Sequence, residues 1–220
     1  MMPDCPAKLT FPLLTSAAPA ALLVALLLSA TAACSGGAKD YYSQGVAEAK
    51  MGHFDQALLD LDKAIEGNPN YAKAYFSRGL VRQSKNDPKG AVGDFSKTIE
   101  LEPKNSAAYD ARGISKAALS DLDGAMADFN EAITLDSTDA RAYSNRGITR
   151  FDKGDLVGAL ADCNRAVELG PLAYQPYVNR GIVKNKLGDE VGSNADFSRA
   201  IALNPNAKAF IQSKGYSIAN

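Results

Sequence analysis

The sequence predicts an all-α protein, an α-solenoid in which five helix-turn-helix repeats form a right-handed superhelix and a C-terminal helix caps the last repeat. Three observations support this fold class. Similar residues recur every 34 positions, apolar and small residues recur at spacings of three and four, and Gly, Asn or Asp marks the middle of each repeat. The predicted repeats are 38–71, 72–105, 106–139, 140–173 and 174–207, and residues 208–220 form the predicted capping helix.

The composition excludes several classes of function. The 220 residues include 24 Lys and Arg against 25 Asp and Glu, so there is no basic excess to bind nucleic acid. His53 is the only histidine, which excludes Ser-His-Asp triads and histidine-rich metal sites. Of three cysteines only Cys163 lies beyond residue 34, so the repeats contain no disulfide framework. We therefore predict a protein that is not an enzyme and needs no cofactor or metal.

Residues 1–33 have the features of a signal peptide. One basic residue, Lys8, precedes an uncharged stretch, residues 17–33, whose centre is rich in leucine. A length of about 17 residues is the lower limit for a membrane-spanning helix. Pro19 makes the stretch still less suited to a permanent anchor. The alternatives to a lipoprotein signal are an ordinary signal peptide cleaved near Ala33 and an uncleaved membrane helix.

Thr31 to Cys34 resemble the lipobox of bacterial lipoproteins, in which the cysteine is acylated and becomes the first residue. The family usually has Leu, Val or Ile where this chain has Thr31. The resemblance implies lipidation at Cys34, with residues 34–37 as the lipidated cysteine and a short tether. It also implies, because Ser35 follows the cysteine, a position on the outer membrane. We expect a lipid-anchored, periplasm-facing protein of the cell envelope, or alternatively a secreted or periplasmic one.

Several positions of the repeat carry similar residues in every copy. The strongest columns are Tyr41, Tyr75, Tyr109, Tyr143 and Tyr177, and Gly45, Gly79, Gly113, Gly147 and Gly181. Later columns are Ala57, Ala91, Ala125, Ala159 and Ser193, then Leu61, Phe95, Phe129, Cys163 and Phe197, then Pro69, Pro103, Ser137, Pro171 and Pro205. This order of aromatic, glycine, alanine, aromatic and proline resembles the tetratricopeptide repeat family. Cys163 and Ser137 are departures from its pattern.

The elements of each repeat follow from the residue types in order. The first helix carries the glycine, which lets the neighbouring helix approach closely. A turn follows at Gly52-His53, Asn86-Asp87, Ser120-Asp121, Gly154-Asp155 and Gly188-Asp189, because these residues favour helix ends and N-caps. The second helix ends before the proline, which lacks an amide donor. Neither helix buries its apolar stripe alone, so the repeats stack. The last segment, with Phe210 and Ile211, covers the exposed end of the stack.

Basic and acidic residues form further columns. These are Arg78, Arg112, Arg146 and Arg180, then Arg82, Lys116, Arg150 and Lys184, and Asp60, Asp94, Asp128, Asp162 and Asp196. One interpretation is a row of cations that holds an acidic peptide, a carboxylate or a phosphate. The interpretation that we favour is ion pairing within each repeat, since folding the repeat at its turn places Arg78 level with Asp94. Exposed pairs of this kind contribute only ~0–1 kcal/mol each.

The family resemblance implies a concave surface lined by the first helix of each repeat, where a partner peptide or helix binds. Its candidate residues are Tyr42, Val46, Lys73, Phe76, Leu80, Gln83, Asp110, Ile114, Arg141, Ser144, Ile148, Phe151, Gln175, Val178, Ile182 and Asn185. The alternative for the Val, Leu and Ile residues is packing between repeats. The Lys and Asn pair with which some family members clamp a carboxylate is missing from the corresponding positions.

The predicted function is a scaffold or adaptor for protein–protein interaction in the bacterial cell envelope. The expected partners are envelope proteins or peptide segments, and the membrane through the lipid anchor, but not nucleic acid. The alternative function is a receptor for a single exported peptide, as an accessory of a secretion, transport or envelope-stress system. Residues 207–220 are candidates for a dimer contact, and the sequence leaves the oligomeric state open.

Overall fold

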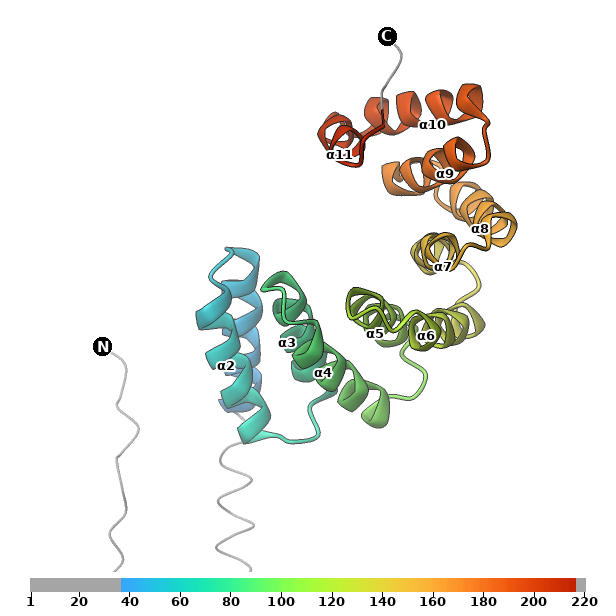
Figure 1. The fold of residues 1–220 in the computed structure, drawn as a ribbon. Coiled ribbons are helices and arrows are strands. Elements are labelled where there is room, and N and C mark those ends of the chain that lie inside the picture. The colour runs from blue at the N-terminus through green and yellow to red at the C-terminus, as the bar shows by residue number, and fades with distance from the viewer. Residues whose placement is uncertain (1–36, 217–220) are drawn as a thin grey trace, which may run out of the picture.

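The structure, a computed structural model, describes residues 37–216 (Figure 1). The predicted signal peptide, the lipidation site Cys34 and the last four residues of the predicted capping helix lie outside this range. Within it, no helix has both the length and the apolar character needed to cross a bilayer. The prediction of an anchor therefore concerns residues that the structure does not describe.

The described residues form helices joined by short turns, without strands. Residues 37–50 are helical and precede the labelled elements. The labelled elements are α2 (Phe54–Gly67), α3 (Ala72–Ser84), α4 (Pro88–Leu101), α5 (Ser106–Ala118), α6 (Leu122–Leu135), α7 (Ala140–Asp152), α8 (Leu156–Leu169), α9 (Tyr174–Lys186), α10 (Glu190–Leu203) and α11 (Ala207–Ser213). These bounds confirm the predicted order of two helices per 34-residue repeat.

The helices form a curved stack of hairpins (Figure 1). Each first helix packs against the second helix of its own repeat, as in α3 with α4, and that second helix packs against the first helix of the next repeat. Consecutive first helices α3, α5, α7 and α9 also contact one another, whereas consecutive second helices α4, α6, α8 and α10 do not. The first helices therefore lie on the inner, concave side of the curve. The all-α solenoid predicted from the sequence is confirmed.

The glycine column permits the close approach of the two helices in a repeat. A Cβ atom added to Gly113 would lie 2.7 Å from Cε1 of Phe129, whose side chain is fully buried. Real Cβ atoms do not approach other atoms this closely, so a larger residue would force the two helices apart. The glycine and aromatic columns thus form one contact, in which the ring of the second helix packs on the backbone of the first.

The turn in the middle of each repeat contains a residue with positive φ, and in repeats two to five an aspartate follows it as the N-cap of the second helix. Ser120 has φ 64°, and the Oδ1 atom of Asp121 accepts a 2.9 Å hydrogen bond from the backbone N–H of Gly124. The second helices of repeats two to five all begin with such an aspartate. His53 takes its place in the first repeat and makes no side-chain cap.

Two predicted boundaries differ from the structure. Gly37, which we assigned to the tether, is already helical. Ala207, which we assigned to the fifth repeat, is the first residue of α11, and this helix ends at Ser213. Gly215 then adopts φ 83° and reverses the chain. The capping segment is therefore a short helix followed by a turn, which buries Ile211 fully against α9 and α10 and brings the ring of Tyr216 onto Phe197, with 5.5 Å between the centroids.

Candidate functional site

The arginine column forms the predicted ion pairs within repeats two to five. Arg112 donates from Nε and Nη2 to the two carboxylate oxygens of Asp128, at 2.9 and 2.7 Å. Arg146 and Asp162, and likewise Arg180 and Asp196, form the same two-bond arrangement. The 16-residue spacing therefore predicted the pairing correctly.

These pairs are buried, which corrects our expectation of exposed ion pairs. The side chain of Asp94 is 3% exposed and that of Arg78 is 16% exposed. Each aspartate also pairs with the cation one turn further along the first helix, as Asp94 does with Arg82 at 2.8 Å. Two cations therefore compensate each carboxylate, and the removal of either partner would leave a charge inside the protein.

The arginines also connect neighbouring repeats, which we did not predict. The Nη1 atom of Arg78 donates to Asp62 at 2.6 Å, and that of Arg146 donates to Asn130 at 2.8 Å. Asp62 and Asn130 belong to the second helix of the preceding repeat. The guanidinium of Arg146 also lies over the ring of Tyr143, 5.5 Å from its centroid. The tyrosine, arginine and aspartate columns thus hold the stack together, and the arginines are not free to bind an anionic ligand.

The concave surface contains most, but not all, of the candidate groove residues. Four are buried between helices, namely Asp110, Ser144, Val178 and Ile182. Asp110, Ser144 and Val178 are therefore not accessible to a partner, whereas Ile182 keeps 9% exposure and lines a pocket of the concave surface. Asp110 and Ser144 are covered by the first helix of the next repeat, and Val178 and Ile182 are covered by α10 and α11. Val178 and Ile182 form a hydrophobic cluster with Phe197 and Ile211.

The two buried polar residues join neighbouring repeats. Asn145 donates a 2.9 Å hydrogen bond to the Oδ1 atom of Asp110, and Asn179 donates a 2.8 Å bond to the hydroxyl of Ser144. Burial raises the pKa of Asp110, because the ionised carboxylate loses its water shell and receives an amide rather than a cation in return. The two amides fix the register between consecutive first helices.

The other twelve candidates are exposed or half-buried, and several also pack within the stack. The rings of Tyr42 and Tyr71 lie 5.0 Å apart, and Phe76 lies 5.6 Å from Phe95. Gln83 donates to the backbone oxygen of Ala111 and therefore bridges the second and third repeats. The most accessible apolar members are Leu80 and Ile114, each 42% exposed. The remaining members are Val46, Lys73, Arg141, Ile148, Phe151, Gln175 and Asn185.

A pocket of about 490 Å³ opens on the C-terminal half of the concave surface. Five of the candidate residues line it, which are Ile114, Ile148, Phe151, Gln175 and Ile182. The other lining residues are Ala117, Phe129, Asn145, Thr149, Asp152, Asn179, Phe210, Lys214 and Tyr216. The contribution of the C-terminal segment was not predicted, because the 34-residue pattern ends before it. We call this site the C-terminal pocket.

Phe151 has a structural role in this pocket. Cys163 takes the place of the aromatic residue of the fourth repeat, and Phe151 packs against the cluster that contains it. The equivalent positions in the other repeats hold Ala49, Gln83, Ala117 and Asn185. The large side chain thus compensates for the small one on the partner helix. Burial also raises the pKa of Cys163 to about 12, so the thiol stays protonated and unreactive at neutral pH.

A second, smaller hollow of about 220 Å³ lies on the N-terminal half. Val46 and Leu80 line it together with Ala49, Lys50, Phe54, Ser77, Val81 and Ser84. It contains one lysine and no carboxylate. Across the described part of the chain, no group of three His, Cys, Asp or Glu residues is arranged to hold a metal ion. The two pockets therefore offer partly apolar surfaces for binding.

Comparison with solved structures shows the same fold. TTC0263, a thermophilic TPR protein of Thermus thermophilus, superposes with a TM-score of 0.70 at 16% identity, over 80% of this chain and 97% of that one. YrrB, described as a TPR protein with an unusual peptide-binding site, gives 0.60 at 22% identity, over 80% and 91%. PilF of Pseudomonas aeruginosa gives 0.67 at 17% identity, over 83% and 88%.

Comparison with family models finds the same repeat. A tetratricopeptide repeat model matches residues 42–106, and a TPR repeat model matches residues 113–154. No curated protein sequence matches the chain. The two family models match tetratricopeptide repeats within this chain, in agreement with its 34-residue period and its stacked helical hairpins.

Proposed function

We propose that this protein is a non-enzymatic scaffold that binds a segment of another protein on its concave surface. The observation that carries this proposal is the C-terminal pocket, which lies on the inner face of the curve and is lined by eight aliphatic or aromatic and six polar or charged side chains. Such a surface suits a peptide or a helix, which presents its own apolar side chains at regular spacing. Leu80 and Ile114 extend the apolar surface towards the N-terminus.

The similarity to YrrB supports this proposal, since that protein is described as having a peptide-binding site. At 22% identity the similarity shows a shared fold and no shared ligand. The residues of this chain must therefore carry the argument. The four arginines of the arginine column do not form the binding site, because each is already paired with an aspartate, as Arg146 is with Asp162. The remaining apolar and aromatic groups favour a polypeptide over a small anion.

We also propose that the protein acts in the bacterial cell envelope, anchored by a lipid on Cys34 and facing the periplasm from the outer membrane. The sequence of residues 31–34 supports the anchor. The test is fractionation of cells that express the wild type or the Cys34→Ser variant. We expect the wild type in the outer-membrane fraction with a labelled fatty acid attached, and the variant without the label. A wild-type chain that carries no label would contradict the anchor and leave the binding proposal intact.

Photo-crosslinking in cells tests the binding proposal. A photoreactive amino acid replaces Ile114 on α5 of the concave surface in one variant. In the control variant it replaces Glu131, an exposed residue of α6 on the opposite side. We expect crosslinked protein partners from position 114 and none of them from position 131. Several partners would favour a scaffold, a single partner would favour a receptor for one peptide, and equal crosslinking from both positions would contradict the proposal.

A further inference from the structure

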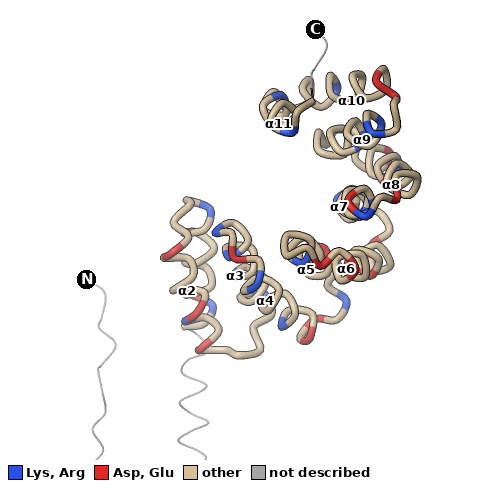
Figure 2. Tube along the Cα trace, viewed as in Figure 1, with Lys and Arg blue, Asp and Glu red and all other residues tan. Residues whose placement is uncertain are grey.

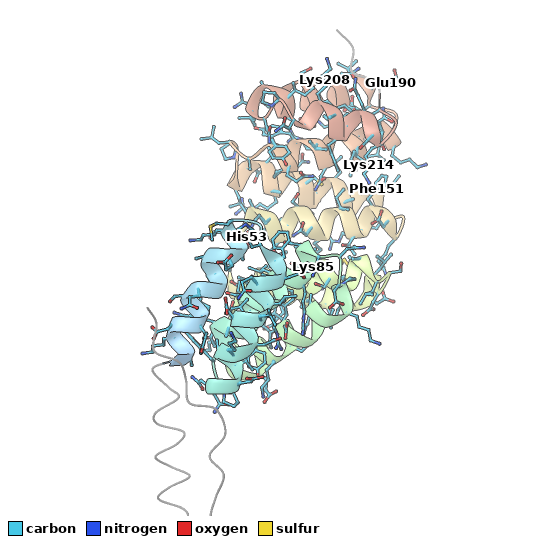
Figure 3. All side chains as sticks on the ribbon, turned by 90° about the vertical axis from the view of Figure 1, so that its left-hand side faces the viewer. His53, Lys85, Phe151, Glu190, Lys208 and Lys214 are labelled. Atoms are coloured by element: carbon cyan, nitrogen blue, oxygen red, sulfur yellow. The ribbon has the colours of Figure 1, made fainter. Side chains whose placement is uncertain are left out.

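The C-terminal pocket contains two charged side chains, Asp152 at the end of α7 and Lys214 just after α11. Phe151 and Phe210 lie beside them in the lining. Figure 3 shows Phe151 and Lys214 one above the other on the same face of the molecule. Two charges of opposite sign and two aromatic rings therefore surround one opening, although they come from segments about 60 residues apart in the sequence.

Neither charge has an ionic partner among residues 37–216. Asp152 and Lys214 do not approach within the 4.0 Å that defines an ion pair, and neither forms a hydrogen bond through its side chain to a described residue. The ammonium of Lys214 lies 5.6 Å from the centroid of the Phe210 ring. Burial raises the pKa of the Asp152 carboxyl, and Lys214 only partly opposes this effect. A cation from outside would therefore stabilise the ionised carboxylate.

The position of Asp152 has no structural role shared by the other repeats. The equivalent residues are Lys50, Ser84, Ala118 and Lys186, so only the fourth repeat carries an acid there. The aspartates paired with arginine lie on the second helices, whereas Asp152 belongs to a first helix. Asp110 is also on a first helix but accepts a hydrogen bond from Asn145 of the next repeat, a contact that Asp152 lacks. Asp152 is therefore a feature of this pocket and not of the repeat.

We propose that the C-terminal pocket binds a polypeptide segment that presents a basic side chain to Asp152 and an acidic side chain to Lys214. The apolar part of the segment would contact Ile148, Phe151 and Phe210. This inference rests on the proposed function and names the chemistry of the partner. A small anion, or a segment with charges of one sign only, would meet a like charge at either Asp152 or Lys214, which disfavours both.

Selection from a library of random peptides displayed on phage, with the purified full chain as the target, tests this proposal. We expect the selected peptides to combine Arg or Lys with Asp or Glu and with apolar residues. Replacement of the basic residue of such a peptide by Gln should weaken binding to the wild type about three- to fivefold, as for one partly exposed ion pair. The same replacement should have little effect on binding to the Asp152→Asn variant.

Replacement of the acidic residue of the peptide by Gln should likewise weaken binding to the wild type and have little effect on binding to the Lys214→Gln variant. Two matched control variants remove a charge outside the pocket, Glu190→Gln on α10 and Lys208→Gln on α11 (Figure 3). Both should bind the peptides as the wild type does. Peptides without a charge preference, peptide effects that persist in Asp152→Asn, or a failure to select any peptide would overturn the proposal. Peptides that bind only near Leu80 would overturn it and leave the proposed function standing.

Discussion

The first two repeats have the same backbone arrangement but differ in the side chains that hold them. In the second repeat, Arg78 donates from Nε and Nη2 to the carboxylate of Asp94, and Asp87 caps the second helix. In the first repeat, the arginine is replaced by Gln44 and the cap by His53. Figure 2 shows the charged residues distributed along the whole stack. The apolar and small residues at equivalent positions are therefore required in every repeat. The paired arginine and the capping aspartate add stability, and the first repeat folds without them.

The difference is clearest at the buried aspartate. Asp60 is as buried as Asp94, yet its contacts are a 3.1 Å hydrogen bond from Gln56 and Lys63 at 3.6 Å. No guanidinium of the described residues reaches it. The first repeat also has only one neighbouring repeat in the described chain, so it lacks a stacking contact on its outer side. We therefore expect the first repeat to be the least stable part of the array.

The largest expected effect is the loss of a buried aspartate in the second repeat. The Asp94→Ala variant leaves Arg78 and Arg82 without their shared carboxylate, and we expect a loss of about 3 kcal/mol in the free energy of unfolding. The matched Asp60→Ala variant removes no arginine pair and should lose about 1 kcal/mol. Urea denaturation followed by circular dichroism measures both. Equal losses would contradict the difference between the two repeats.

Overpacking of the fourth repeat should have the next largest effect. The Cys163→Phe variant restores the aromatic residue of the other repeats, but Phe151 already packs over this site. We expect a loss of about 2 kcal/mol. A second change, Phe151→Ala, should recover part of this loss in the double variant, although it is destabilising alone. Thermal unfolding of the wild type, the two single variants and the double variant gives the coupling free energy between the two side chains. Additive effects would show that the two side chains do not compensate each other.

A gain of about 1 kcal/mol is expected from Ser193→Ala in the last repeat. The hydroxyl of Ser193 is buried and has no hydrogen-bond partner among the described residues. The four preceding repeats have alanine there, as at Ala159, and such an unsatisfied group destabilises the folded state. Urea denaturation of the variant measures the gain. A loss of stability would mean that the hydroxyl has a partner in solution.

The smallest effect concerns Asp110 and depends on pH. Its folded-state pKa is raised by burial, so the folded protein prefers the protonated form. The resulting contribution to stability is fully present below the unfolded-state pKa and is lost as the pH rises through the folded-state pKa. We expect Asp110→Asn to remove this dependence and to be slightly more stable than the wild type at neutral pH. Denaturation curves from mildly acidic to neutral pH test this, and the opposite slope would contradict it.

Much of the fold could be predicted because the same residue types recur at equivalent positions in the five repeats. The glycine column, which includes Gly113, predicted the close approach of the paired helices, and the structure adds that Phe129 of the aromatic column makes this contact. The 16-residue spacing predicted the Arg–Asp pairs, because a hairpin of two equal helices places those residues level. A further column two residues after the buried aspartates, with Asp62 and Asn130, was also visible in the sequence. It could have predicted the contacts between repeats.

The candidate site was harder to predict. Whether a residue of a first helix faces the groove or the next repeat depends on the angle between repeats, which periodicity does not define. Ile114 lies exposed, whereas Ile182, at the equivalent position two repeats later, is buried in a cluster with Ile211 of the capping helix α11. The groups from Phe210, Lys214 and Tyr216 come from a segment outside the repeat pattern. Contacts with α9 and α10 position its short helix and turn, and the 34-residue pattern contains no residues that predict these contacts.

The most direct test of binding on the concave surface is hydrogen exchange of the full chain with and without a partner protein captured by crosslinking. We expect the partner to slow exchange at the exposed ends of α5, α7, α9 and α11 and to leave α4, α6, α8 and α10 unchanged. Slower exchange confined to the second helices, on the outer side of the curve, would contradict the account.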